Sequence, residues 1–118
     1  MHESILLIED KPNLQYLYQK ELAESGFVVT ATADSNDGIN RLKQQHVDVV
    51  VVDLNSSCSS AMEYLQKIIA VDRDVKVVLH NEDPETTWDF RFWIADALLS
   101  QSPSSKGLKD TIVKVLHT

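Results

Sequence analysis

Short β-branched apolar runs alternate with segments of helical periodicity along this 118-residue chain, and this alternation limits the possible folds more than any other feature. The apolar runs predict five strands, at residues 5–8, 27–32, 47–52, 75–79 and 97–99. The run at 47–52 is apolar on both faces apart from Asp48, as expected for a strand buried in a parallel sheet. Strands separated by helices predict an α/β fold with right-handed crossovers and helices on both faces.

The segments between these runs predict five helices. The first begins at Pro12 and stops at Gly26, while Ser35 or Asn36 caps the second, in which Gly38 lowers helix propensity. A polar loop at 55–60 precedes the third helix. The fourth helix is expected at residues 86–94. The other four have apolar residues at helical spacing, which are Leu14, Leu17, Tyr18 and Leu22 in the first, Ile39 and Leu42 in the second, Met62, Leu65, Ile68 and Ile69 in the third, and Leu108, Ile112, Val115 and Leu116 in the fifth.

Composition agrees with one soluble globular domain over residues 1–118, because 43% of the residues are hydrophobic and 25% are charged. The net charge of -7 argues against direct binding of nucleic acid, which needs clustered cations. A single cysteine, Cys58, excludes an internal disulfide and fits a reducing compartment. Without an apolar run long enough for a membrane span, and without a signal peptide, we expect a cytoplasmic protein that makes no membrane contact.

Three carboxylates follow two of the predicted strands. Glu9 and Asp10 come after the first strand and Asp53 after the third, so they converge if these strands are neighbours. Clustered anions repel and take up a proton or a cation, and a set of oxygen ligands favours a hard divalent ion such as Mg²⁺. A carboxylate beside such an ion can attack phosphorus. The alternative is three solvated acids at strand ends.

At this point the chain resembles a known family, the receiver domain of bacterial two-component response regulators. The residues that carry the resemblance are ILLIEDK at 5–11, VVVVDL at 49–54, VKVVL at 75–79 and ADALL at 95–99. The resemblance implies a three-layer, doubly wound, flavodoxin-like fold similar to that of the chemotaxis protein CheY, with strand order 2-1-3-4-5.

The resemblance also implies chemistry at the ends of these strands. Asp53 is then the phosphoryl acceptor, and a histidine kinase or a phosphotransfer protein is the donor. Asp10, Asp53 and the backbone carbonyl of Asn55 ligate Mg²⁺, with Glu9 acting directly or through water. Enzymatic activity is then limited to self-phosphorylation and autodephosphorylation at Asp53.

The chain departs from the family pattern at several positions. His80 stands where the family has Ser or Thr, Gln101 stands where it has Lys, and Leu98 replaces the aromatic residue of the switch. An amide in place of an ammonium weakens phosphoryl stabilisation by about ten- to a hundredfold. Two mechanisms stay open, namely phosphorylation at Asp53 with Mg²⁺, and a phosphorylation-independent pseudo-receiver that acts as a protein-interaction module. His80 and Gln101 can also be ordinary polar loop residues.

The output is expected to be protein contact. Four of the eight aromatic residues lie at 88–93, so a helix there exposes at least one large ring, unless it is simply a bulky and well-packed helix. The resemblance implies that residues 86–118 contact a downstream protein target or form a homodimer. Because the sequence ends at Thr118, we expect any effect to travel through a partner or through a longer chain from which this segment was cut.

Two enzymatic alternatives are weaker. A phosphatase of the haloacid dehalogenase type needs a second acid two residues after Asp53, where this chain has Asn55. Nucleotide binding of the Rossmann type needs a glycine-rich turn after the first strand, and Gly26, Gly38 and Gly107 do not form one.

Overall fold

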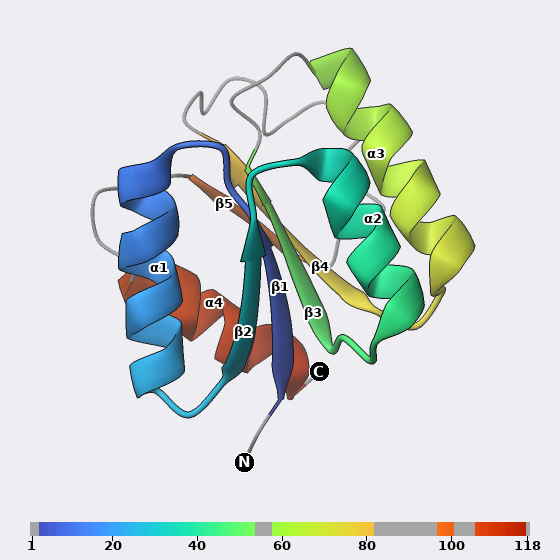
Figure 1. Ribbon diagram of the computed structural model, residues 1–118. Helices are drawn as coiled ribbons and strands as arrows, with labels where there is room; N and C mark the ends of the chain where they lie inside the picture. Colours follow the sequence, from blue (N-terminus) through green and yellow to red (C-terminus); the bar gives the residue numbers. More distant parts are fainter. Residues whose placement is uncertain (1–2, 54–57, 82–96, 101–105, 118) are drawn as a thin grey trace.

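Five parallel strands form one sheet in the structure, a computed structural model that describes residues 3–53, 58–81, 97–100 and 106–117 (Figure 1). The strands are β1 (Ser4–Ile8), β2 (Val28–Thr32), β3 (Val49–Asp53), β4 (Lys76–Asn81) and β5 (Ala97–Ser100). Their order across the sheet is β2-β1-β3-β4-β5, and every neighbouring pair is parallel. This confirms the predicted fold class and strand order.

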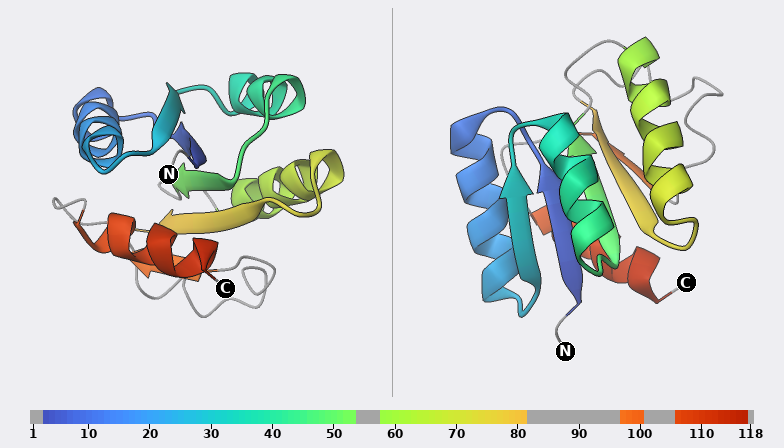
Figure 2. Two further views of the ribbon diagram at one scale, coloured as in Figure 1. Left: turned by 90° about the horizontal axis from the view of Figure 1, so that it is seen from below. Right: turned by 45° about the vertical axis from the view of Figure 1, so that its right-hand side comes forward.

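Helices cover both faces of the sheet (Figure 2). The described helices are α1 (Pro12–Glu24), α2 (Ser35–Gln44), α3 (Cys58–Val71) and α4 (Lys106–Leu116). Viewed along the sheet in Figure 2, α1 and α4 lie on one side and α2 and α3 on the other. None of the helices in the described ranges is long and apolar enough to cross a membrane.

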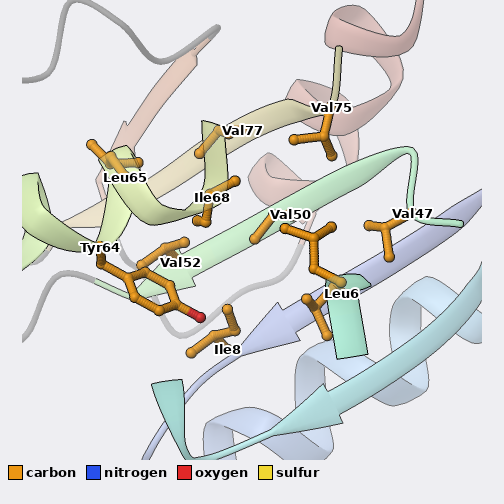
Figure 3. Packing of buried hydrophobic residues seen from close by; sticks show 11 residues of the cluster. Leu6, Ile8, Val47, Val50, Val52, Tyr64, Leu65, Ile68, Val75 and Val77 are labelled. Atoms are coloured by element: carbon orange, nitrogen blue, oxygen red, sulfur yellow. The ribbon is translucent and has the colours of Figure 1, made fainter. Parts of the chain in front are cut away.

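Alternation along β1 and β3 divides the core into two clusters. Leu6, Ile8, Val50 and Val52 pack with α2 and α3 (Figure 3), whereas the residues between them pack with α1 and α4. Because successive side chains of a strand point to opposite faces, a fully apolar strand must be covered on both sides. The apolar runs seen in the sequence therefore account for the three layers.

Several boundaries differ from the sequence predictions. The third strand begins at Val49 rather than at 47, although Val47 is buried. Helix α3 begins at Cys58, so the last three residues of the predicted loop at 55–60 are helical. The cap of α2 is Asp34, whose Oδ1 accepts the Asn36 N–H at 3.0 Å, so the assignment to Ser35 or Asn36 was wrong. The predicted helix at 86–94, with its aromatic residues, lies outside the described residues.

The predicted stop of the first helix is confirmed. Helix α1 ends at Glu24, and Gly26 adopts a φ of 97°, the left-handed conformation that glycine accepts without steric cost. The chain then turns directly into β2, which pairs with β1. This tight return brings the start of α1 and the end of β2 to the same edge of the sheet.

Candidate functional site

The backbones of the predicted acids lie at the carboxyl edge of the sheet, which is the upper edge in Figure 1. Ile8 of β1 pairs with Val52 of β3, so the next residues, Glu9 and Asp53, continue side by side on neighbouring strands. Asp53 in turn pairs with His80 of β4. The register thus brings the backbones of Glu9, Asp53 and His80 into three adjacent positions.

The two members of the acidic pair have different surroundings. Glu9 is 1% exposed, whereas its neighbour Asp10 is exposed. The Glu9 carboxylate accepts the Lys11 N–H at 3.2 Å through Oε2. Burial of a charged carboxylate is costly unless hydrogen bonds or a cation compensate it. Glu9 therefore holds a buried carboxylate at this edge, and its backbone position is next to that of Asp53.

The backbone of Glu9 is also held at both of its polar groups. Its N–H donates to the Thr32 carbonyl at 3.0 Å, and its carbonyl accepts from Nε2 of Gln15 at 3.1 Å. Gln15 was not among the residues predicted from the sequence. The available signal was its position, because Gln15 lies three and seven residues before the buried Tyr18 and Leu22 and so shares their side of α1. A polar residue in an apolar row usually has a hydrogen-bonding role.

Among the described residues at this edge, Glu9 and Asp10 offer carboxylate oxygens, which suit a hard divalent cation. Within the described ranges, no three His, Cys, Asp or Glu side chains form a metal-binding group. The predicted magnesium set also needs the Asp53 side chain and Asn55, which lie outside the described part of the chain, as do the His80 side chain and Gln101. The described acids, Glu9 and Asp10, supply oxygen donors of the kind that Mg²⁺ prefers.

Two further groups of titratable residues have shifted pKa values, one at the start of β3 and one where α2 begins. The Ser4 N–H, with a smaller contribution from His46, holds the pKa of Asp48 below its ordinary value, and partial burial opposes the effect. The pKa of Asp37 is also lowered, mainly by a hydrogen bond from Arg41. Burial raises the pKa of the Tyr64 phenol, and the charges of Asp34 and Asp37 add to the effect.

Of the expected partner surface at residues 86–118, the structure describes residues 97–100, which form β5, and residues 106–117, which contain α4. Helix α4 packs on the sheet through Ile112 and Val115, while Val113 is 37% exposed. Trp88 and its aromatic neighbours lie outside the described residues.

Comparisons with known proteins agree with this arrangement. The family model of the response regulator receiver domain matches residues 5–88. The chain is 26% identical over 124 residues to protein-glutamate methylesterase/protein-glutamine glutaminase 2 of Caulobacter vibrioides, covering 96% of this chain and 36% of that protein. It is 33% identical over 79 residues to the regulatory protein VirG of Agrobacterium tumefaciens, covering 67% of this chain and 29% of that protein. The chain thus spans about a third of the length of these relatives.

Solved structures share the fold. The response regulator TrrA of Thermotoga maritima, in complex with Mg²⁺-BeF, matches with a TM-score of 0.85 at 24% identity. The match covers 96% of this chain and 98% of the TrrA chain. TrrA in complex with the histidine kinase ThkA also has a TM-score of 0.85 at 24% identity and covers 97% and 98% of the two chains. An orphan response regulator of H. pylori has a TM-score of 0.83 at 23% identity and covers 97% and 96%.

Proposed function

The chain belongs to the family of response regulator receiver domains, and from this premise we propose that it is a cytoplasmic signalling domain that accepts a phosphoryl group at Asp53 with Mg²⁺. The register of β1 and β3 carries this proposal, because Glu9 and Asp53 follow the paired residues Ile8 and Val52. The burial of Glu9 adds support, because a buried carboxylate beside a second acid favours a bound cation.

In the proposed reaction, a carboxylate oxygen of Asp53 attacks the phosphorus of a phosphohistidine on a histidine kinase or phosphotransfer protein. The new O–P bond forms as the N–P bond breaks, and the imidazole nitrogen keeps the electron pair of the broken bond. Asp10, Asp53 and the Asn55 carbonyl, with Glu9 direct or through water, would hold Mg²⁺, which would neutralise charge on the phosphoryl oxygens. In this arrangement Asp53 would be both a ligand and the nucleophile.

His80 and Gln101 complete the proposed phosphoryl site as N–H donors. The pairing of His80 with Asp53 across β3 and β4 supports a position for its side chain beside the acceptor. The Gln101 amide is a weaker donor to an anion than an ammonium, since hydrogen bonds from a charged donor are about twice as strong. We therefore propose a phosphorylated state that is less stable than that of a receiver with lysine at this position.

The proposed signal passes through protein contacts. The complex of TrrA with ThkA supports a histidine kinase as a partner of this chain, and residues 86–118 are the proposed surface for a downstream target or a second copy. The likeness to the methylesterase covers 36% of that protein, so its enzymatic activity forms no part of the proposal.

The proposal is tested by incubating the protein with Mg²⁺ and acetyl phosphate and measuring the intact mass. We expect one added phosphoryl group on the wild type, none on Asp53→Asn, and one on the matched variant Asp48→Asn, which changes the residue just before the same strand. No adduct on the wild type contradicts the proposal and favours a phosphorylation-independent interaction module. An adduct on Asp53→Asn shows that the acceptor is another residue.

A further inference from the structure

The side chain of Gln15 ties the backbone of Glu9 to helix α1. This inference rests on the proposed function, and it concerns how the acidic pair is oriented. We infer that Gln15 is a positioning residue for Glu9 and Asp10. It fixes the peptide unit that joins them and thereby the direction in which their side chains point from the backbone.

The hydrogen bond from Gln15 acts on the peptide unit between Glu9 and Asp10. The Glu9 carbonyl oxygen, which accepts from Nε2 of Gln15 at 3.1 Å, belongs to the peptide plane between Glu9 and Asp10. Rotation of that plane turns the Cα–Cβ bond of Asp10, since the plane ends at the Asp10 Cα. A hydrogen bond to the carbonyl opposes this rotation.

The donor is itself held in place. Gln15 lies in the first turn of α1, where its own N–H donates to the Lys11 carbonyl at 2.9 Å, and its side chain is half-buried. On the other side, the Glu9 N–H donates to Thr32 of β2 at 3.0 Å. The peptide units on both sides of Glu9 are therefore tied to two different elements, the end of β2 and the start of α1.

Asp10 depends on this tie more than Glu9 does. Glu9 is 1% exposed and is surrounded by neighbouring atoms, whereas Asp10 is exposed and packing restricts it little. The direction of the Asp10 side chain then follows mainly from its backbone. Groups that orient the ligands of a metal ion contribute to its affinity without touching the ion.

The test compares Gln15→Met, which keeps the length of the side chain but removes the donor, with Gln19→Met, one helical turn further from Glu9. Isothermal titration with Mg²⁺ alone gives the dissociation constant, and thermal unfolding gives the stability of each variant. We expect Gln15→Met to raise the dissociation constant about three- to tenfold relative to Gln19→Met. A role in helix stability alone would lower the melting temperature and leave the dissociation constant unchanged.

The outcomes separate this inference from the proposed function. If the wild type binds Mg²⁺ and Gln15→Met binds it as tightly as Gln19→Met, the inference is wrong and the proposed function stands. If the wild type does not bind Mg²⁺, both are wrong. Should Gln15→Met fail to fold, the wild type still provides a test by NMR, in which the side-chain amide of Gln15 is expected to shift with the same Mg²⁺ midpoint as the Asp10 N–H. An unchanged Gln15 signal overturns the inference.

Discussion

At the scale of single residues, Gly38 shows why a poor helix former occupies the interior of α2. A Cβ at this position would lie 2.6 Å from Oη of Tyr64 and 2.9 Å from Cδ1 of Ile8. Tyr64 comes from α3, and its hydroxyl donates to the Ser35 carbonyl at 2.8 Å. Figure 3 shows the Tyr64 ring with its oxygen directed toward Ile8. The absence of a side chain at Gly38 therefore lets α3 approach α2 and β1.

We predict that Gly38→Ala lowers the free energy of unfolding in urea by a net of about 1 kcal/mol, because steric strain outweighs the gain in helix propensity. The buried ends of Tyr64 and Ile8 have little room to move away. The control is Asn40→Ala, at an exposed position of the same helix, with an expected change within about 0.5 kcal/mol.

A second variant locates the strain at this contact. Tyr64→Phe removes the nearer of the two atoms, so we expect the cost of Gly38→Ala to be smaller in the Tyr64→Phe background, as a double-mutant cycle measures. If Gly38→Ala is as stable as Asn40→Ala, the close approach of α3 does not constrain this position.

At the scale of elements, helix α2 begins with a cap that the sequence left ambiguous. Three consecutive residues, Asp34, Ser35 and Asn36, are all favourable caps, and the pattern placed the cap at one of the last two. Asp34 takes the role because Thr32 Oγ1 accepts the Asp34 N–H at 3.2 Å, which fixes the turn out of β2 one residue earlier. The end of the strand thus sets the start of the helix.

We predict that Asp34→Ala destabilises the protein by about 1 kcal/mol, since the Asn36 N–H loses its acceptor. Ser35→Ala is the matched control, with an expected change within about 0.5 kcal/mol. Thermal or urea unfolding of the two variants checks the assignment. Equal losses of stability in the two variants would mean that Asp34 and Ser35 share the cap.

The opposite edge of the sheet has its own link between elements. Asp48 precedes β3, and its carboxylate accepts the Ser4 N–H of β1 at 2.8 Å and pairs with His46 at 2.8 Å. Its carbonyl accepts the Lys76 N–H of β4 at 3.1 Å. This residue therefore joins the starts of three neighbouring strands, so its ionisation state affects the stability of the sheet.

The pH dependence follows from the lowered pKa of Asp48. Because the pKa in the folded protein lies below the ordinary 3.8, the charged carboxylate contributes stability above that pH, and the contribution is lost as the pH falls through the folded pKa. We predict that Asp48→Asn costs about 1 kcal/mol at neutral pH and less as the solution becomes acidic. Urea unfolding across this range measures the difference, and the exposed Asp74→Asn serves as control. A loss of unfolding free energy in Asp48→Asn that does not change with pH would contradict a role of the charged carboxylate.

At the scale of the whole molecule, the strand order decides which residues meet. Because β1 and β3 are adjacent, Glu9, which follows β1, and Asp53, which ends β3, have neighbouring backbone positions although they are far apart in sequence. The two core clusters on either face hold these strands rigidly. A ligand bound at the carboxyl edge is thereby coupled to the stability of the entire fold.

We predict that Mg²⁺ together with beryllofluoride raises the melting temperature of the wild type. A ligand that binds the folded state alone stabilises it by about 2.7 kcal/mol at a hundred times its dissociation constant, which corresponds to a rise of roughly 10 °C. Asp53→Asn should show no rise, and Mg²⁺ with fluoride alone is the second control. If the melting temperature of the wild type is unchanged by Mg²⁺ and beryllofluoride, the ligand does not bind at Asp53.

The chain's local patterns were sufficient for most of the architecture. Apolar runs and helical periodicity depend on which side of each element is buried, so they predicted the strands, the described helices and the stop at Gly26 before any contact was known. The acidic residues were equally visible, and the resemblance to receivers supplied the strand order that the structure confirms. The roles of Asp53, His80, Asn55 and Gln101 stay predictions.

Tertiary structure alone decided the contacts between distant residues. That Glu9 is buried while Asp10 is exposed, that Gln15 holds the Glu9 carbonyl and that Gly38 accommodates Tyr64 all depend on how a helix sits against a strand end. Such contacts join elements whose separation in sequence carries no information about their distance. Periodicity shows which faces are buried, but only the assembled sheet shows which atoms on those faces touch.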